Sequence, residues 1–187
     1  MASKEIRVDG DRLFLRPLTE DDLTDEYLGW VTDPETTTYL DVQHTSPTIE
    51  SLKAYLATFD NAHTNFAFAI VVRDPTDGPG THIGNITLRV NRVNRYGTEG
   101  ILVSKAHQGK GYGTEARSLL YAFGFDELGL EKIVSGSAAA NSASIASNER
   151  LGFVKEGHFA EHVLVGETRV DSVQLGLLKR NFRPYTP

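Results

Sequence analysis

Apolar residues along the chain either alternate with polar ones or gather in short runs, and this pattern predicts seven strands. The segment 12–18 alternates and predicts a strand. The apolar run 66–72 is followed by a turn rich in proline and glycine, so we expect it to pair antiparallel with 82–90. The remaining predicted strands are 98–103, 132–135, 153–165 and 170–178.

Helical spacing appears between these strands. The capping-box spacing of Thr19–Asp22 predicts the start of a first helix, and Pro34 a second, short one. Further helices are predicted over 49–59, 114–129 and 142–151. Strands and helices in this order predict an α+β fold with αβα layers and a mixed, mostly antiparallel sheet of six to seven strands. We expect one domain over 1–187, with a polar, flexible leader over about 1–9.

Composition narrows the functional classes. The formal net charge of −6 disfavours a nucleic-acid binder, which needs a basic surface, and mildly favours cationic substrates. The chain has no cysteine, which excludes thiol nucleophiles, disulfides and thiolate metal sites. Its histidines are scattered without ligand spacing, so no metal site is predicted. No apolar run has the length of a membrane span or signal, so we expect a cytoplasmic protein that binds no membrane.

A glycine-rich turn between a predicted strand and a predicted helix is the clearest chemical signal. Glycines at 109, 111 and 113 allow backbone amides to approach an anion at the helix N-terminus. Lys110 would add charge there or remain a solvated turn lysine. Plain loop geometry is the alternative. A nucleotide-triphosphate loop would need Ser or Thr directly after the lysine, and a dinucleotide fold would need its turn after the first strand. Neither pattern fits.

Two motifs in the chain resemble those of a known family. They are Gln108-Gly109-Lys110-Gly111-Tyr112-Gly113-Thr114-Glu115-Ala116 and Asn141-Ser142-Ala143-Ser144 with Asn148-Glu149-Arg150-Leu151-Gly152-Phe153 and Glu156-Gly157. The first resembles the acetyl-CoA signature of the GNAT superfamily of N-acetyltransferases, and the second resembles the ribosomal-protein alanine N-acetyltransferase (RimJ/RimL-like) branch. They occur in the family's order and at its separation.

The resemblance implies that acetyl-CoA binds where two parallel strands splay apart. It places the pyrophosphate on the turn from Gln108 to Thr114 and the pantetheine arm along a strand containing Ile101, Leu102 and Val103. It also implies that Asn141 hydrogen-bonds the arm and that Ser144 lies near the thioester sulfur. Helix capping is the alternative role for Asn141 and Ser144.

The implied chemistry is direct attack of a neutral amine on the thioester. A backbone N–H near Val103 would polarise the carbonyl. Glu99 is the candidate base, although Thr98-Glu99-Gly100 departs by one residue from the family's usual Glu-Ile-Gly, and an exposed strand-end glutamate is the alternative. The tyrosine that many relatives use as acid is Asn148 here, so Ser144 or water would protonate the thiolate.

The acceptor is less well defined. Tyr27, Trp30 and Tyr39 would line a pocket or pack into the core, and Glu161 and His162 would bind an ammonium group or remain solvated. We expect a primary amine as acceptor: a small amine, an amino sugar or a protein N-terminus. A non-catalytic acyl-CoA sensor or interaction module is the alternative. An exposed edge strand in the last hairpin would allow a homodimer.

Overall fold

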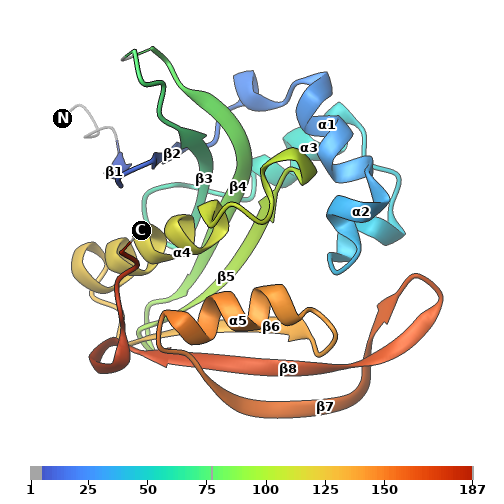
Figure 1. The fold of residues 1–187 in the computed structure, drawn as a ribbon, viewed down its shortest axis with the longest axis vertical. Helices are drawn as coiled ribbons and strands as arrows, with labels where there is room; N and C mark the ends of the chain where they lie inside the picture. The colour runs from blue at the N-terminus through green and yellow to red at the C-terminus, as the bar shows by residue number, and fades with distance from the viewer. Residues whose placement is uncertain (1–5, 77, 187) are drawn as a thin grey trace.

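Eight strands form one open sheet in the computed structural model, which describes residues 6–76 and 78–186 (Figure 1). They lie in the order β1-β2-β3-β4-β5-β6-β8-β7, and every neighbouring pair is antiparallel except β5 with β6. The strands are β1 (Val8–Asp9), β2 (Leu13–Pro17), β3 (Asn65–Val72), β4 (Thr81–Asn91), β5 (Tyr96–Val103), β6 (Lys132–Ala138), β7 (Val154–Val165) and β8 (Thr168–Leu178).

Five α-helices accompany this sheet within the described ranges: α1 (Asp25–Thr32), α2 (Pro34–Thr37), α3 (Ile49–Leu56), α4 (Tyr112–Ala122) and α5 (Ser142–Arg150). The first helix does not begin at Thr19 as predicted. A single tight turn forms there, and α1 begins after Thr24, whose side chain accepts a hydrogen bond from the Tyr27 N–H at 3.2 Å. Of the helices described, none is both long and apolar enough to cross a membrane.

Side-chain alternation in the strands produces the predicted three layers. On β2 and β3, one set of residues packs against Ala116 and Leu120 of α4, and the residues between them pack against α3 and Phe59. Figure 1 shows α4 and α5 on one face, with α3 behind the sheet. The α4 face contains Leu13, Leu15, Phe66, Phe68 and Ile70, and the α3 face contains Phe14, Ala67, Ala69 and Val71.

The N-terminal segment differs from the prediction. Residues 1–5 of the predicted leader lie outside the described residues, but Val8 and Asp9 form β1 and pair with Leu15 and Phe14. This two-residue strand raises the strand number from the predicted six to seven to eight. A strand so short has no hydrophobic periodicity, so the sequence pattern could not indicate it.

Candidate functional site

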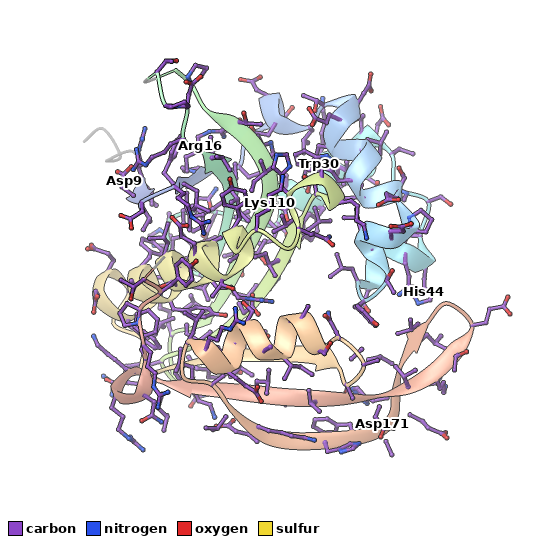
Figure 2. All side chains as sticks on the ribbon, viewed as in Figure 1. Asp9, Arg16, Trp30, His44, Lys110 and Asp171 are labelled. Atoms are coloured by element: carbon purple, nitrogen blue, oxygen red, sulfur yellow. The ribbon has the colours of Figure 1, made fainter. Side chains whose placement is uncertain are left out.

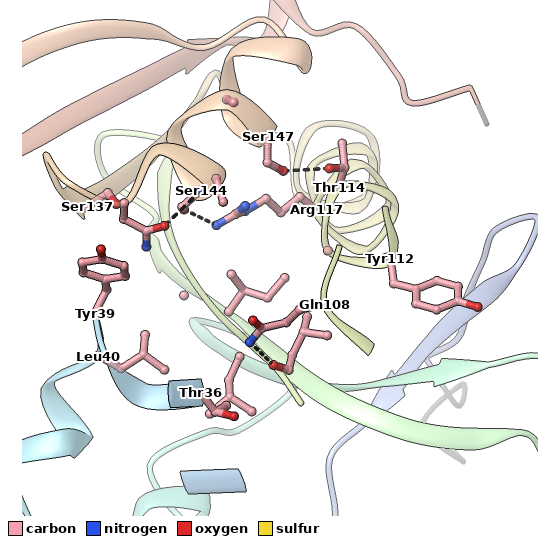
Figure 3. A pocket seen from close by; sticks show the side chains of 18 of the residues that line it. Thr36, Tyr39, Leu40, Gln108, Tyr112, Thr114, Arg117, Ser137, Ser144 and Ser147 are labelled. Atoms are coloured by element: carbon pink, nitrogen blue, oxygen red, sulfur yellow. Dashed lines mark hydrogen bonds between the residues drawn. The ribbon is translucent and has the colours of Figure 1, made fainter. Parts of the chain in front are cut away.

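A cleft opens where the parallel strands β5 and β6 separate. The two strands pair only at Tyr96–Lys132, Gly97–Ile133 and Thr98–Val134, and beyond this point β6 pairs with β8 alone. The cleft has a volume of about 700 Å³ and lies between β5, the start of α4 and the first turns of α5 (Figure 3). The splayed sheet implied by the resemblance is therefore present, and residues 99–103 of β5 line it.

The glycine turn brings the N-terminus of α4 to one end of this cleft. Gly109 and Gly111 have φ of 74° and 81°, in the left-handed region that glycine adopts without strain, and Gly111 is the residue from which α4 starts. The first N–H groups of α4 have no partner within the helix, and the helix dipole makes this end positive. The arrangement can bind an anion such as a pyrophosphate.

Six of the seven predicted turn residues line the cleft: Gln108, Gly109, Gly111, Tyr112, Gly113 and Thr114. Lys110 does not line it. Figure 2 shows Lys110 on the turn that precedes α4, where its carbonyl accepts a hydrogen bond from Arg12 Nη1 at 3.0 Å. The Gln108 amide donates to the Val103 carbonyl at 2.9 Å, so the side chain of Gln108 ties the turn to the end of β5.

Arg12, the residue before β2, holds the glycine turn in place, a contact that sequence reasoning missed. Its backbone N–H and its Nε donate to the two carboxylate oxygens of Glu115 at 2.9 and 2.8 Å. The remaining guanidinium nitrogens reach the Lys110 carbonyl and the Tyr185 hydroxyl. The sequence shows that Glu115 is an acidic residue in the first turn of a helix. Nothing in the neighbouring residues indicates that its partner is Arg12, 103 residues away.

Asn141 and Ser144 lie together at the start of α5 and line the cleft. The Ser144 N–H donates to Asn141 Oδ1 at 3.2 Å, so Asn141 caps the helix. The Ser144 hydroxyl accepts a hydrogen bond from Arg117 Nη2 at 2.8 Å. Because the cap uses only the backbone N–H of Ser144, its hydroxyl is not involved in capping and remains at the cleft.

Glu99 is buried, so its interpretation as an exposed strand-end residue is wrong. Its side chain is 2% exposed, Oε1 accepts from the Ser135 hydroxyl at 2.6 Å, and Arg117 Nε lies 3.5 Å from the same oxygen. Neighbouring residues of a strand point to opposite faces, so Thr98 faces away from this network. Burial opposes the charge of Arg117, but Glu99 raises the guanidinium pKa above its ordinary value, so the arginine stays protonated.

Asn148 occupies the far side of the same buried network. The Tyr121 hydroxyl donates to Asn148 Oδ1 at 2.9 Å, and Asn148 Nδ2 donates to the Ser135 hydroxyl at 3.0 Å. Burial, reinforced by the charge of Glu99, raises the pKa of Tyr121 well above its ordinary value, which keeps the phenol protonated. Asn148 therefore contributes to the polar interior behind the cleft and does not line the cleft.

A second cavity of about 410 Å³ adjoins the first on the other side of β6. Both cavities are lined by Tyr39, Leu40, Gly136 and Ser137. They therefore meet beside the part of β6 that is not paired with β5. The second cavity is also lined by Asp41, Gln43, Phe159, His162, the segment 163–165 and the segment 172–174.

The predicted acceptor residues divide between this cavity and the core. Tyr39 and His162 line it. Tyr27 is 2% exposed and belongs to the core, and the partly buried Trp30 packs against it at a ring-centroid distance of 5.8 Å. Neither residue lines either of these two cavities. Glu161 also lies outside both linings.

An irregularity in β7 accounts for the different positions of Glu161 and His162. Residues 160–162 stand opposite the single residue Asp171 of β8, and Glu161 has a φ of 46°. Asp171 Oδ1 accepts a hydrogen bond from the Glu161 N–H at 2.9 Å, which stabilises the bulge. Bulges redirect side chains next to functional sites, and here His162 lines the second cavity. Among the described residues, no group of three His, Cys, Asp or Glu forms a metal site.

Comparison with protein families agrees with the cleft and the sheet. Residues 12–154 match the family model of the acetyltransferase (GNAT) domain. The match covers more than half of the chain, which therefore belongs to the GNAT acetyltransferase family. This assignment identifies an acetyl-CoA-dependent acetyltransferase and confirms the family, fold and cofactor predicted from the sequence.

Individual relatives give the same family and fold. The chain is 35% identical over 104 residues to the Bacillus subtilis protein named "Putative ribosomal N-acetyltransferase YdaF", an alignment that spans 55% of the chain and 57% of that relative. It is 26% identical over 174 residues to the uncharacterized N-acetyltransferase p20 of Bacillus licheniformis, across 92% and 96% of the two chains. The crystal structure of spermidine N-acetyltransferase from Vibrio cholerae with CoA and spermine has a TM-score of 0.79 at 22% identity, covering 91% of this chain and 97% of that one.

Proposed function

We propose that this protein transfers the acetyl group of acetyl-CoA to a primary amine that enters through the second cavity. The observation that carries the proposal is the meeting of the two cavities beside Gly136 and Ser137. An acyl donor in the larger cleft and an amine in the smaller cavity would meet there. Holding two reactants in this geometry is worth roughly 7–11 kcal/mol of the barrier in well-oriented systems.

The larger cleft suits acetyl-CoA along its whole length. The pyrophosphate would bind at the N-terminus of α4, and the pantetheine arm would follow the edge of β5 that β6 leaves unpaired after Thr98. This edge offers backbone N–H and C=O groups in the manner of an added strand. The N–H of Val103 is the proposed donor to the thioester carbonyl, where negative charge develops during attack.

The proton of the attacking amine leaves by way of water in the acceptor cavity. Glu99, the base predicted from the sequence, has its carboxylate turned inside toward Ser135 and Arg117. An acceptor must lie within hydrogen-bond reach of the amine or one water away. The burial of Glu99 favours a structural role in the cleft wall, and we therefore propose solvent as the proton acceptor.

A small cationic amine is the proposed acceptor. Asp41 places a carboxylate on the wall of the second cavity, and Tyr39 and Phe159 add aromatic faces that attract cations. The net charge of −6 also favours a cationic substrate, and the structural relative from Vibrio cholerae contains spermine. A protein N-terminus is the second candidate, because the YdaF name refers to ribosomal N-acetylation.

Steady-state assays with several amines test this proposal. Purified protein with acetyl-CoA is offered spermidine, spermine, an amino sugar and an alanine-starting ribosomal peptide, with free CoA and acetylated product measured. We expect the polyamines to have the highest kcat/KM. A preference for the peptide would indicate the RimJ/RimL-like branch, and acetyl-CoA binding without turnover of any amine would contradict the proposed catalysis.

A single substitution in the glycine turn tests the cofactor site. Gly111→Glu places a carboxylate at the start of α4 and should abolish acetyl-CoA binding in calorimetry while the protein remains folded. Undiminished binding would exclude the glycine turn as the pyrophosphate site.

Pairing of two copies along β7 is a separate proposal. This strand lies at the edge of the sheet, and its outer backbone groups have no strand partner among the described residues. Sedimentation velocity at two protein concentrations distinguishes a monomer from a dimer.

A further inference from the structure

A buried ion pair forms part of the wall of the larger cleft. Glu99 and Arg117 have side chains that are 2% and 6% exposed. Glu99 Oε2 and Arg117 Nε make no hydrogen bond to any described residue, which is unusual for buried polar atoms. Apolar residues often replace a buried ion pair without loss of stability, so stability alone does not explain this one. Both residues line the cleft, and there Arg117 also donates a hydrogen bond to Ser144.

The guanidinium of Arg117 determines which way the Ser144 hydroxyl points its proton. Arginine has five N–H donors and no acceptor, so in the 2.8 Å contact Ser144 Oγ is the acceptor (Figure 3). The proton of Ser144 has no acceptor among the described residues. Since Ser144 lines the cleft, its proton is available to a ligand bound there.

The sulfur of the cofactor is the ligand atom that this hydroxyl would meet. With the pyrophosphate at α4 and the acetyl group beside Gly136 and Ser137, the end of the pantetheine arm would lie in the part of the cleft that β5 and the first turn of α5 line. Resting on the proposed function, we propose that Arg117, held by Glu99, is a positioning residue that directs the Ser144 hydroxyl to donate a hydrogen bond to the departing sulfur.

The chemical step balances without proton transfer from Ser144. The amine nitrogen forms the C–N bond, the C–S bond breaks, and its electron pair goes to sulfur. The amine gives its proton to water, and CoA leaves as a thiolate that accepts the hydrogen bond. Hydrogen bonds in a chain polarise one another, so donation from Arg117 makes the Ser144 hydroxyl a stronger donor. This arrangement supplies stabilisation of the leaving group without a tyrosine at position 148.

The thiol pKa of bound CoA measures this interaction without any acceptor amine. Ultraviolet absorbance of the thiolate is followed against pH in the complex of the protein with CoA, and free CoA titrated in the same way is the reference. We expect the bound thiol to titrate below this reference, and Ser144→Ala to raise its pKa by about one unit, a tenfold loss of thiolate. Ser142→Ala, an exposed serine of the same helix, is the matched control and should leave the titration unchanged.

Kinetics distinguish a role in bond breaking from a role in binding. The hydrogen bond strengthens only as charge develops on sulfur, so Ser144→Ala should lower kcat roughly tenfold while KM for acetyl-CoA changes less than about threefold. A loss confined to KM would overturn the inference.

A test of the positioning role of Arg117 requires a variant that still folds. Arg117→Met alone leaves the Glu99 carboxylate buried without its cation, so the test uses Glu99→Gln with Arg117→Met, which retains an acceptor for Ser135. We expect this double variant to lower kcat and raise the thiol pKa as Ser144→Ala does, and the triple variant to lose no more. Independent, multiplying losses would overturn the positioning role.

The outcomes separate this inference from the proposed function. A bound thiol with an unshifted pKa in the wild-type protein and in Ser144→Ala overturns the inference while leaving acetylation intact. A shifted thiol pKa with no amine acetylated contradicts the proposed function alone. Failure of the wild-type protein to bind CoA contradicts both.

Discussion

Replacement of Gly111 by alanine tests how the glycine turn is built and what it binds. Gly111 has a φ of 81°, and a Cβ there would lie 3.2 Å from Arg12 Nη2 and 3.2 Å from the Tyr185 hydroxyl. A left-handed backbone at a residue with a side chain costs roughly 1–2 kcal/mol. Displacing the Arg12 guanidinium weakens its hydrogen bonds and adds about 1 kcal/mol. We therefore expect Gly111→Ala to lose about 2–3 kcal/mol of unfolding free energy.

Gly129 provides the matched control. Its φ is 68°, a Cβ would meet nothing within 4 Å, and it lies outside the lining of the cleft. Gly129→Ala should therefore lose only the backbone contribution of roughly 1–2 kcal/mol. In a domain of this size each kcal/mol lowers Tm by about 2–4 °C, so the two variants should differ by about that amount.

Thermal unfolding and calorimetric titration with acetyl-CoA measure both effects. Gly111→Ala should be the less stable variant and should bind acetyl-CoA more weakly, whereas Gly129→Ala should bind it as the wild type does. Equal Tm losses would refute the steric contribution of Arg12 and Tyr185. Wild-type affinity in Gly111→Ala would refute the dependence of cofactor binding on the geometry of the turn.

Three further predictions concern the support of the turn, pH dependence and the acceptor cavity. Arg12→Met leaves Glu115 without its cation, so it should lower the free energy of unfolding in urea by about 1.5–3 kcal/mol and raise KM for acetyl-CoA. We expect a loss at the lower end of this range because the Arg12 side chain is partly exposed. Burial raises the pKa of Asp22, but hydrogen bonds from Arg16 outweigh it and hold the pKa below its usual value. The Asp22 contribution is therefore complete above about pH 4 and falls at lower pH, so the difference in urea midpoint between wild type and Asp22→Asn should shrink as the pH falls below 4. Tyr39→Ala should raise KM for the amine more than KM for acetyl-CoA in steady-state assays; an unchanged amine KM would exclude Tyr39 from the acceptor site.

Local patterns were sufficient to predict most of the sheet and the cofactor turn. The apolar run 66–72, the turn after it and the strand 82–90 form one hairpin, as predicted, because each depends on neighbouring residues. Gly109 and Gly111 have the positive φ that a sharp turn before a helix requires. Such features are encoded within about ten residues, which is the range that a sequence pattern can indicate.

Side-chain orientation and distant contacts could not be predicted in the same way. A register difference of one residue decides whether Glu99 faces the acceptor or the interior, and nothing in the residues 98–100 fixes that register. The contact of Arg12 with Glu115 joins segments 103 residues apart. The bulge at 160–162 depends on pairing with β8, so the separation of Glu161 from His162 follows only from the assembled sheet.

Asn148 shows how this limitation affects the functional argument. In the sequence it marks the position of an absent tyrosine, which suggests an incomplete catalytic site. In the structure its amide is fully buried and joins Tyr121 to Ser135, which in turn donates to Glu99. A buried polar side chain needs partners. The partners of Asn148 come from α4 and β6, and Ser135 extends the network to β5, so the sequence alone could not bring them together. Asn148 is therefore part of the network that holds the cleft wall, and its identity is not evidence against catalysis.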